Sequence, residues 1–383
     1  MAFLFFVSAY LFGESLAYIM GYWKEGTSGV DKKRMIVILL IWFHTISYFM
    51  KVKIGINGFG RIGRLAARII LNSPDLILTA INSRSEISSH AYLLQYDSVY
   101  RKFKRQVRVE KDALVIGKQK VRCFNDDKPA DIPWDKVKAE IVLECTGKFR
   151  TSEDCRSHLK KGVRNVIISA PAKDKTPTYV MGVNQQNLNP KKEKIISNSS
   201  CTTNCLATVI KVLDDRFGVK RGNLTTIHAV TDSQNLLDNS HKKDVRLRRS
   251  ALQNLIPSTS GSAKDLAKLF PYLAGKLVCR SIRVPTATVS LIDLVVEVGK
   301  PTTLEEVNGE FIKASEKKLK GILAVAKEQL VSTDYVGDPH SAVVDPFLTD
   351  VIENNLVHVV AWYDNEWGYT NRLVEMVKFI GNK

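Results

Sequence analysis

Residues 51–64 read KVKIGINGFGRIGR, and this stretch decides the fold. An apolar strand pattern over 51–57 meets a glycine-rich turn, and an amphipathic helix pattern follows. A GxGxxG turn between a strand and a helix is typical of dinucleotide-binding domains, because glycine lets backbone amides approach a pyrophosphate at the helix N-terminus. The alternative is a glycine turn that serves packing alone. We expect the cofactor to contact Gly58, Gly60, Arg61, Ile62 and Gly63.

The end of the second strand bears on the choice of cofactor. A strand pattern covers 76–82, and NAD-binding domains usually carry Asp or Glu just after it, bonded to the ribose 2′-hydroxyl. This chain has Ser83 followed by Arg84. A small neutral residue removes the charge that repels a 2′-phosphate, and an arginine binds phosphate well. The sequence therefore favours NADP, or the use of both NADP and NAD. The alternative is that Arg84 points to solvent and Ser83 serves NAD.

Two further strand patterns fit the same sheet, at 139–144 and 165–169. Each is followed by small residues, as is expected of strands whose ends face a cofactor. We therefore expect Thr146 and Ser169 to contact the cofactor.

The segment 197–205 carries the candidate nucleophile. It is small and polar, and a helix pattern over 206–213 follows it, which places Cys201 at a helix N-terminus. The positive end of the helix dipole lowers a thiol pKa and favours a nucleophilic thiolate. His228 ends a β-rich run and is a candidate base for that thiol. The alternatives are a plain helix cap at Cys201 and a structural histidine at His228.

The composition is that of a globular protein and excludes a disordered, collagenous or all-membrane chain. The chain has 383 residues, 45% of them hydrophobic and 25% charged, and this length suggests two or three domains. Lys and Arg number 56 against 39 Asp and Glu, and the net charge of +17 favours anionic partners. The six cysteines form no CxxC pair. We therefore expect no metal site and a reducing, cytoplasmic location.

Residues 1–49 differ from the rest of the chain. The stretches 2–23 and 35–50 are apolar, and the second is 16 residues long, short of the roughly 20 that a membrane-spanning helix needs. It would also run without a linker into the strand at 51–57. We favour the hypothesis that translation starts at Met50 and that 1–49 is not native. The alternative is a membrane-associated extension.

Five motifs, in this order along the chain, resemble the phosphorylating glyceraldehyde-3-phosphate dehydrogenase family: GINGFGRIGR, ISNSSCTTNC, TTIHAVT, RVPT and WYDNEWGY. The resemblance runs from about Lys51 to the C-terminus. It implies an α/β fold with a Rossmann NAD(P)-binding domain at 50–200, completed by 365–383. It also implies an α+β catalytic domain at 201–364 with a largely antiparallel sheet, which the alternating run 289–298 suits. The family is usually homotetrameric.

The resemblance also implies a reaction. D-glyceraldehyde 3-phosphate is oxidised to 1,3-bisphosphoglycerate while NAD or NADP is reduced, in either metabolic direction, glycolysis or gluconeogenesis. Cys201 attacks the aldehyde, His228 takes the hydroxyl proton, and a backbone amide near Cys201 holds the oxyanion. Hydride transfer leaves a thioester, which inorganic phosphate then attacks.

The same resemblance assigns the remaining site residues. Thr231 and Arg283 would hold the substrate phosphate, and Arg246 or Arg249, in a loop that the family brings close to both phosphate sites, would assist at either. The attacking phosphate would contact Ser200, Thr202, Ser260 and Gly261. Asn365 would bond the nicotinamide carboxamide, with Tyr369 packed nearby. Ser240 stands where NAD-specific members often carry proline, and it resembles the NADP-using members.

Two other functions stay open. Erythrose-4-phosphate dehydrogenase is a close relative with the same cysteine and histidine, and it mostly hydrolyses its thioester. An enzyme-like body that binds RNA is a different class, which the net charge permits although the sequence holds no dedicated nucleic-acid module.

Overall fold

Two β-sheets organise the part of the chain that the computed structural model describes, which is residues 51–160, 162–241 and 244–383. Val52–Lys383 forms one compact unit that contains both sheets. The extension 1–49 lies outside the described residues, and so do Lys242 and Lys243 of the basic segment near Ser240. Within the described ranges, no helix is both long enough and apolar enough to cross a membrane.

The first sheet has the strand order β3-β4-β5-β2-β1-β6-β7-β8. From β5 to β8 neighbouring strands run parallel, while β3, β4 and β5 pair antiparallel at one edge. The chain moves outward from β1 through β2 and then returns to place β6 on the other side of β1. This reversal opens a crevice at the carboxyl ends of β1 and β6, where open α/β sheets bind their ligands. The bounds are β1 Val52–Asn57, β2 Leu76–Asn82, β3 Val107–Glu110, β4 Ala113–Ile116, β5 Gln119–Phe124, β6 Ile141–Glu144, β7 Asn165–Ile168 and β8 Ile195–Ser197.

The glycine turn between β1 and α3, Arg61–Asn72, is as tight as the sequence predicts. Gly58 has φ +94°, and a Cβ there would stand 2.6 Å from the amide nitrogen of Thr146. A Cβ on Gly63 would stand 2.1 Å from the carbonyl oxygen of Gly58, so only glycine lets the helix begin so close to the strand. The buried residues of α3, Leu65 and Ile70 among them, then pack on the sheet.

The second sheet has the order β10-β11-β9-β12-β15-β14-β13. Four pairings are antiparallel, and the parallel ones join β9 to β11 and β13 to β14, so the expected largely antiparallel sheet is confirmed. Along β12 buried and half-buried residues alternate, as the pattern at 289–298 predicts. The bounds are β9 Val219–Ala229, β10 Ile256–Thr259, β11 Leu277–Val284, β12 Ser290–Val298, β13 Leu323–Val325, β14 Ala342–Ile352 and β15 Leu356–Tyr363.

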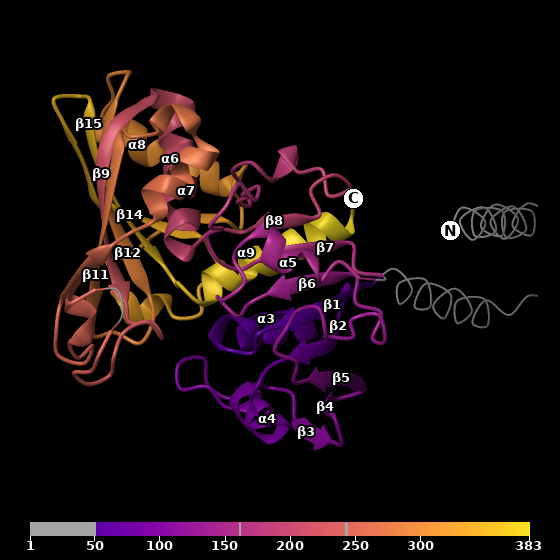
Figure 1. Cartoon of the computed structure of the whole chain (residues 1–383). Coiled ribbons are helices and arrows are strands. Elements are labelled where there is room, and N and C mark those ends of the chain that lie inside the picture. Colours follow the sequence, from indigo (N-terminus) through magenta and orange to yellow (C-terminus); the bar gives the residue numbers. More distant parts are fainter. Residues whose placement is uncertain (1–50, 161, 242–243) are drawn as a thin grey trace, which may run out of the picture. The chain divides into compact units, whose positions relative to one another are not determined.

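The helices cover the sheets and join the two halves. In Figure 1, α6, α7 and α8 lie on one side of the second sheet, and buried residues of α6 and α8 share its core. The last helix, α9, returns to the first sheet, where Leu373 and Val377 share a core with Ile54 and Ile56 of β1 and the helix packs beside α3. The bounds are α4 Ile87–Gln95, α5 Ser152–Arg156, α6 Cys201–Phe217, α7 Ser262–Leu269, α8 Leu304–Glu316 and α9 Trp367–Gly381.

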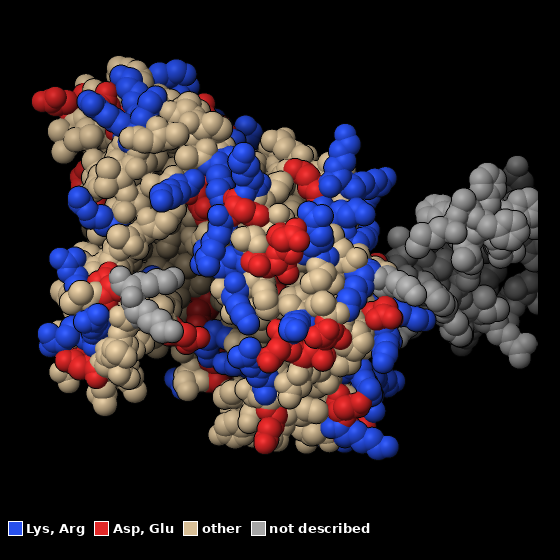
Figure 2. Space-filling model, viewed as in Figure 1, with Lys and Arg blue, Asp and Glu red and all other residues tan. Residues whose placement is uncertain are grey.

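Charge is spread over the surface. Figure 2 shows Lys and Arg side chains interspersed with Asp and Glu across the visible face. Several of these form exposed ion pairs, such as Arg249 with Asp238 and Arg122 with Asp112. The excess of positive charge is therefore not gathered into one patch on this face.

Candidate active site

Cys201 is the first residue of α6. The Ser200 side chain caps the helix by accepting a hydrogen bond from the Thr203 amide at 3.1 Å, which fixes the entry of the chain into the helix. The sulfur of Cys201 lies 3.5 Å from Nε2 of His228. A thiol and an imidazole are thus in direct contact at a helix N-terminus, as the sequence predicts for a nucleophile and its base.

The second sheet places Arg283 beside His228. The strands β9 and β11 are parallel neighbours, and their register pairs His228 with Arg283. Nη1 of Arg283 lies 2.7 Å from Nδ1 of His228 and 3.3 Å from the carbonyl oxygen of Ala229. The guanidinium keeps a buried Nε with no hydrogen-bond partner among the described residues. That free donor suits an anion in the adjoining cavity.

The histidine has two tautomers available to it. Its Nδ1 lies 2.7 Å from the Ala229 carbonyl oxygen as well as from the Arg283 guanidinium, which can only donate. In one tautomer Nδ1 accepts from Arg283, and in the other it donates to the carbonyl in place of that contact. In the second tautomer Nε2 is left unprotonated toward Cys201, which is the form that a base needs. Burial lowers the pKa of His228 to about 3, and the charge of Arg283 adds to this effect. The imidazole is therefore neutral at physiological pH.

The thiol does not follow the expectation of a lowered pKa. Burial raises the pKa of Cys201, and the charge of Arg283 and hydrogen bonds from Thr202 only partly oppose this. Removing the thiolate from water outweighs the favourable helix end. The directions of both pKa shifts favour the neutral thiol of Cys201 and the neutral imidazole of His228.

A cavity of about 660 Å³ opens onto this pair. It is lined by most of the residues expected around the substrate and the nicotinamide: Ser200, Cys201, His228, Thr231, Arg283, Asn365 and Tyr369. Two of them are held firmly, since Ser290 donates to Oδ1 of Asn365 at 3.0 Å and Tyr369 donates to the Ser199 carbonyl at 3.0 Å.

A second cavity of about 490 Å³ lies at the carboxyl ends of β1, β2 and β6. It is lined by the expected cofactor residues Gly58, Gly60, Arg61, Ile62, Ser83, Arg84, Thr146 and Ser169. Arg61, Ile62, Ser169 and Asp232 line both cavities, so the two cavities adjoin each other. No atom stands within 4 Å of a Cβ built on Gly60, so there is room for a ligand at the first amides of α3. The residues present fit a dinucleotide with its pyrophosphate at this turn.

Glu144 contacts two residues that line the second cavity, Asn57 and Thr146, and no local pattern in the sequence identifies it. Its carboxylate is buried and accepts hydrogen bonds from Asn57 at 2.6 Å, from His158 at 3.1 Å, and from the amide and the hydroxyl of Thr146. Trp134 donates to Nδ1 of His158, so Nε2 of that ring carries the proton that Glu144 accepts. The contacts from Thr146 and Asn57 hold the Thr146 turn and the end of β1 in place.

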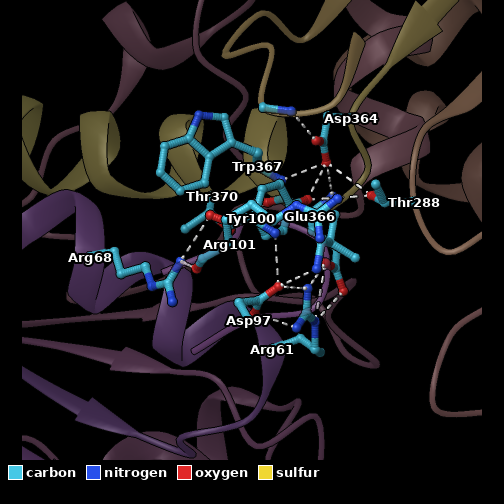
Figure 3. A network of polar contacts seen from close by, with 12 residues as sticks. Arg61, Arg68, Asp97, Tyr100, Arg101, Thr288, Asp364, Glu366, Trp367 and Thr370 are labelled. Carbon is cyan, nitrogen blue, oxygen red and sulfur yellow. Dashed lines mark hydrogen bonds and ion pairs between the residues drawn. The ribbon is translucent and has the colours of Figure 1, made fainter. Parts of the chain in front are cut away.

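Arg61 joins three segments that are distant in the sequence. Its guanidinium donates to Asp97, after α4, and to Glu366, before α9, at 2.5 Å each (Figure 3). Burial alone lowers the pKa of Arg61, but the hydrogen bonds and charges of Glu366 and Asp97 raise it above its usual value. Arg61 thus ties the glycine turn to the segment that presents Asn365.

Asp364 holds the other side of Asn365. Its Oδ1 accepts hydrogen bonds from Tyr100 at 2.7 Å and Thr288 at 3.2 Å, and also from the first amides of α9 (Figure 3). Its Oδ2 accepts from the Gly337 amide at 2.8 Å. Nothing in the local sequence identifies this network, because its members come from separate loops.

Several expected site residues do not line either cavity: Gly63, Thr202, Ser240, Arg246, Arg249, Ser260 and Gly261. Gly63 packs against the backbone of Gly58 instead. Thr202 is buried and its hydroxyl lies 2.9 Å from that of Tyr363. Ser260 and Gly261 lie at the start of α7. Ser240, Arg246 and Arg249 lie on an exposed loop, where Arg249 pairs with Asp238 at 2.9 Å. Among the described residues, no group of three or more His, Cys, Asp or Glu side chains could hold a metal ion.

Known protein families match the segments that form both cavities. A model described as the glyceraldehyde 3-phosphate dehydrogenase NAD binding domain matches residues 52–152, and one described as the C-terminal domain of the same enzyme matches 200–365. The chain belongs to the glyceraldehyde-3-phosphate dehydrogenase family. The match to the NAD binding domain supports a nicotinamide dinucleotide as the cofactor of the second cavity.

Individual members of the glyceraldehyde-3-phosphate dehydrogenase family are similar over almost their whole length. Glyceraldehyde-3-phosphate dehydrogenase 2 of Streptomyces avermitilis is 44% identical over 335 residues, which is 87% of this chain and 100% of that protein. Glyceraldehyde-3-phosphate dehydrogenase 1 of Bacillus cereus is 46% identical over 86% of this chain and 99% of its own length. The enzyme of Geobacillus stearothermophilus is 46% identical over 87% of this chain and 99% of its own length.

Proposed function

We propose that the protein oxidises D-glyceraldehyde 3-phosphate to 1,3-bisphosphoglycerate, using inorganic phosphate and a nicotinamide cofactor. The observation that carries the proposal is the contact of 3.5 Å between the Cys201 sulfur and Nε2 of His228, at a cavity that adjoins the nucleotide cavity. A nucleophile and its base beside a dinucleotide cradle suit covalent oxidation of an aldehyde.

The proton moves through His228. Nε2 takes the thiol proton as the Cys201 sulfur bonds to the aldehyde carbon, and it returns the proton to the new oxyanion to give a thiohemiacetal. Nε2 then takes the hydroxyl proton when the carbon is oxidised to the thioester. The nicotinamide cofactor, when bound, would supply the acceptor for the hydride that leaves that carbon. Attack by phosphate breaks the carbon–sulfur bond and releases the acyl phosphate, and the Cys201 thiolate recovers its proton from His228.

The positive end of α6 and Arg283 supply the electrostatics. The helix end favours the oxyanion that forms beside Cys201. The unpartnered Nε of Arg283 and the Thr231 hydroxyl, both at the first cavity, would bind the substrate phosphate. Ser200, Thr202, Ser260 and Gly261 would receive the attacking phosphate, with Arg246 or Arg249 closing over it. Of these residues only Ser200 lines the cavity, so the assignment of the others is carried by the likeness to the family.

The cofactor would lie across both cavities. The amides after Gly58 and Gly60 would bind its pyrophosphate, Thr146 and Ser169 would line its path, and Asn365 would bond the carboxamide. Ser83 leaves space for a 2′-phosphate and Arg84 offers charge, so the proposal includes both NADP and NAD.

The proposal extends to organisation and location. The nucleotide-binding domain would be 50–200 with 365–383 and the catalytic domain 201–364, because α9 shares the core of the first sheet. We also propose a cytoplasmic location and a homotetramer. The exposed apolar side chains on the loop 231–255 support the assembly, since Leu236 and Leu237 are each 67% exposed and Leu255 is 71% exposed.

Initial rates on the full chain test the activity. With glyceraldehyde 3-phosphate and NAD or NADP in parallel, we expect reduction that depends on inorganic phosphate and is absent in Cys201→Ser. Absence of reduction with both cofactors would overturn the proposal. Phosphate-independent reduction that is faster with erythrose 4-phosphate would instead identify the erythrose-4-phosphate relative.

A further inference from the structure

The edge of the nucleotide cavity carries two acidic residues, Asp126 and Asp127, which follow β5 and not the second strand, β2. The strands β2 and β5 are parallel neighbours, and their register pairs Asn82 with Phe124. The residues that follow both strands therefore lie at the same edge of the sheet. Ser83, Arg84, Asp126 and Asp127 all line the cavity.

The backbone of this edge is firmly held. The Ser83 amide donates to the Phe124 carbonyl at 3.0 Å. The Asn82 side chain donates to the Asp126 carbonyl and accepts from the Asp126 amide, both at 2.9 Å. The two loops are thus joined by three hydrogen bonds, and only the side chains at their tips are free to rearrange.

Arg84 and Asp127 form an ion pair at these tips. Nε of Arg84 lies 2.5 Å from Oδ1 of Asp127, and the side chains are 69% and 68% exposed. An exposed pair of this kind stabilises a fold very little, so a competing anion can open it at little cost. The charge that Arg84 offers to a 2′-phosphate is therefore already matched by a carboxylate of the chain itself.

We propose that Asp127 determines the choice between NAD and NADP, an inference that rests on the proposed function. With Asp127 present, a 2′-phosphate has to displace it from Arg84 and then remain close to its negative charge. An unphosphorylated ribose meets no such repulsion, and its 2′-hydroxyl can donate to the carboxylate, as it does to the acidic residue that usually follows the second strand. Asp127 thus supplies from β5 the acidic group that Ser83 does not provide, and it shifts the preference toward NAD.

Equilibrium binding tests this without turnover. The probes are ADP-ribose and 2′-phospho-ADP-ribose, titrated into the full chain by calorimetry, with NAD and NADP measured in parallel. We expect Asp127→Asn to tighten binding of the 2′-phosphorylated probe by about five- to tenfold and to leave ADP-ribose binding equal or weaker. Adding Arg84→Gln to Asp127→Asn should remove the gain, and so should high salt.

The chain provides a matched control. Arg122 and Asp112 form another exposed arginine–aspartate pair, with side chains 45% and 49% exposed, and neither residue lines the cavity. Asp112→Asn removes the same charge and should leave the ratio of the two affinities unchanged. An equal gain in Asp112→Asn, or no change of the ratio in Asp127→Asn while NAD still binds, would overturn the inference alone. If the native chain binds neither dinucleotide, the proposed function fails together with it.

Discussion

His228 is the residue whose loss should separate catalysis from cofactor binding. It contacts the Cys201 sulfur, and it does not line the nucleotide cavity. We expect His228→Asn to lower kcat by about 10²–10⁴-fold, the usual contribution of a general base, without changing the Kd of the cofactor. His358→Asn is the control, because His358 pairs with Asp293 across the neighbouring strands β15 and β12 and lines neither cavity. Steady-state rates and a cofactor titration check both variants, and an unchanged kcat in His228→Asn would contradict the assigned role.

Glu144 is a residue whose substitution should affect folding and cofactor binding together. All the groups around its carboxylate are donors. Glu144→Gln replaces one accepting oxygen with an NH₂ group, which would face a donor and leave a hydrogen bond unmade. We expect a loss of about 3 kcal/mol in the free energy of unfolding, together with weaker cofactor binding. Urea denaturation and a NAD titration measure the two effects. Glu140→Gln, in a partly exposed pair with Arg164, should change stability by less than about 0.5 kcal/mol, and a similar loss in both variants would contradict this account.

At the scale of elements, Asp174 stabilises the start of α5 in a pH-dependent way. Its carboxylate accepts hydrogen bonds from the amide and hydroxyl of Ser152 and of Thr176. Burial alone raises the pKa of Asp174, but these hydrogen bonds hold it far below its usual value. A lowered carboxyl pKa stabilises the fold above the unfolded pKa of about 3.9, and the stabilisation is lost as the pH falls through the folded pKa.

We therefore expect Asp174→Ala to lower the free energy of unfolding by about 1–2 kcal/mol at pH 7, and the difference from the native protein to shrink as the pH falls below about 4. Urea denaturation at a series of pH values measures it. Asp135→Ala, at an exposed position, should have little effect at any pH. A difference for Asp174→Ala that grows on acidification would show that the sign is wrong.

The elements themselves follow well from the sequence, while their pairing does not. The patterns at 76–82 and 165–169 predict β2 and β7 to within a residue, because period and glycine turns are local signals. The contact between His228 and Arg283 depends instead on which strands pair and in which register. A long crossover separates β9 from β11 in the sequence, so no local pattern predicts that they pair. The burial of Cys201 likewise depends on distant elements. The local sequence therefore does not predict that burial raises the pKa of its thiol.

At the scale of the whole molecule, the site depends on contacts between distant segments. Arg61 and Glu366 are 305 residues apart, yet their ion pair joins the glycine turn to the segment holding Asn365. The recognisable motifs predicted both ends of this link, and only the folded chain shows that they meet.

The loop 231–255 provides the prediction on assembly. Leu237 is 67% exposed, and burial of such a side chain between copies would favour a tetramer. We expect light scattering to give the mass of four chains for the native protein and a smaller mass for Leu237→Asp, because a charge buried at an interface is costly. Val331→Asp, at a site 62% exposed on another part of the surface, should remain tetrameric. A monomeric native protein would contradict the proposal.

The most direct test of the account is to trap the thioester on Cys201. The full chain is mixed with glyceraldehyde 3-phosphate and oxidised cofactor without inorganic phosphate, and its intact mass and peptides are then measured. The account predicts that the acyl group derived from the substrate is attached to the peptide carrying Cys201, is absent in Cys201→Ser, and is discharged when phosphate is added. A reduced cofactor with no acyl group on Cys201, or an acyl group that phosphate does not release, would contradict it.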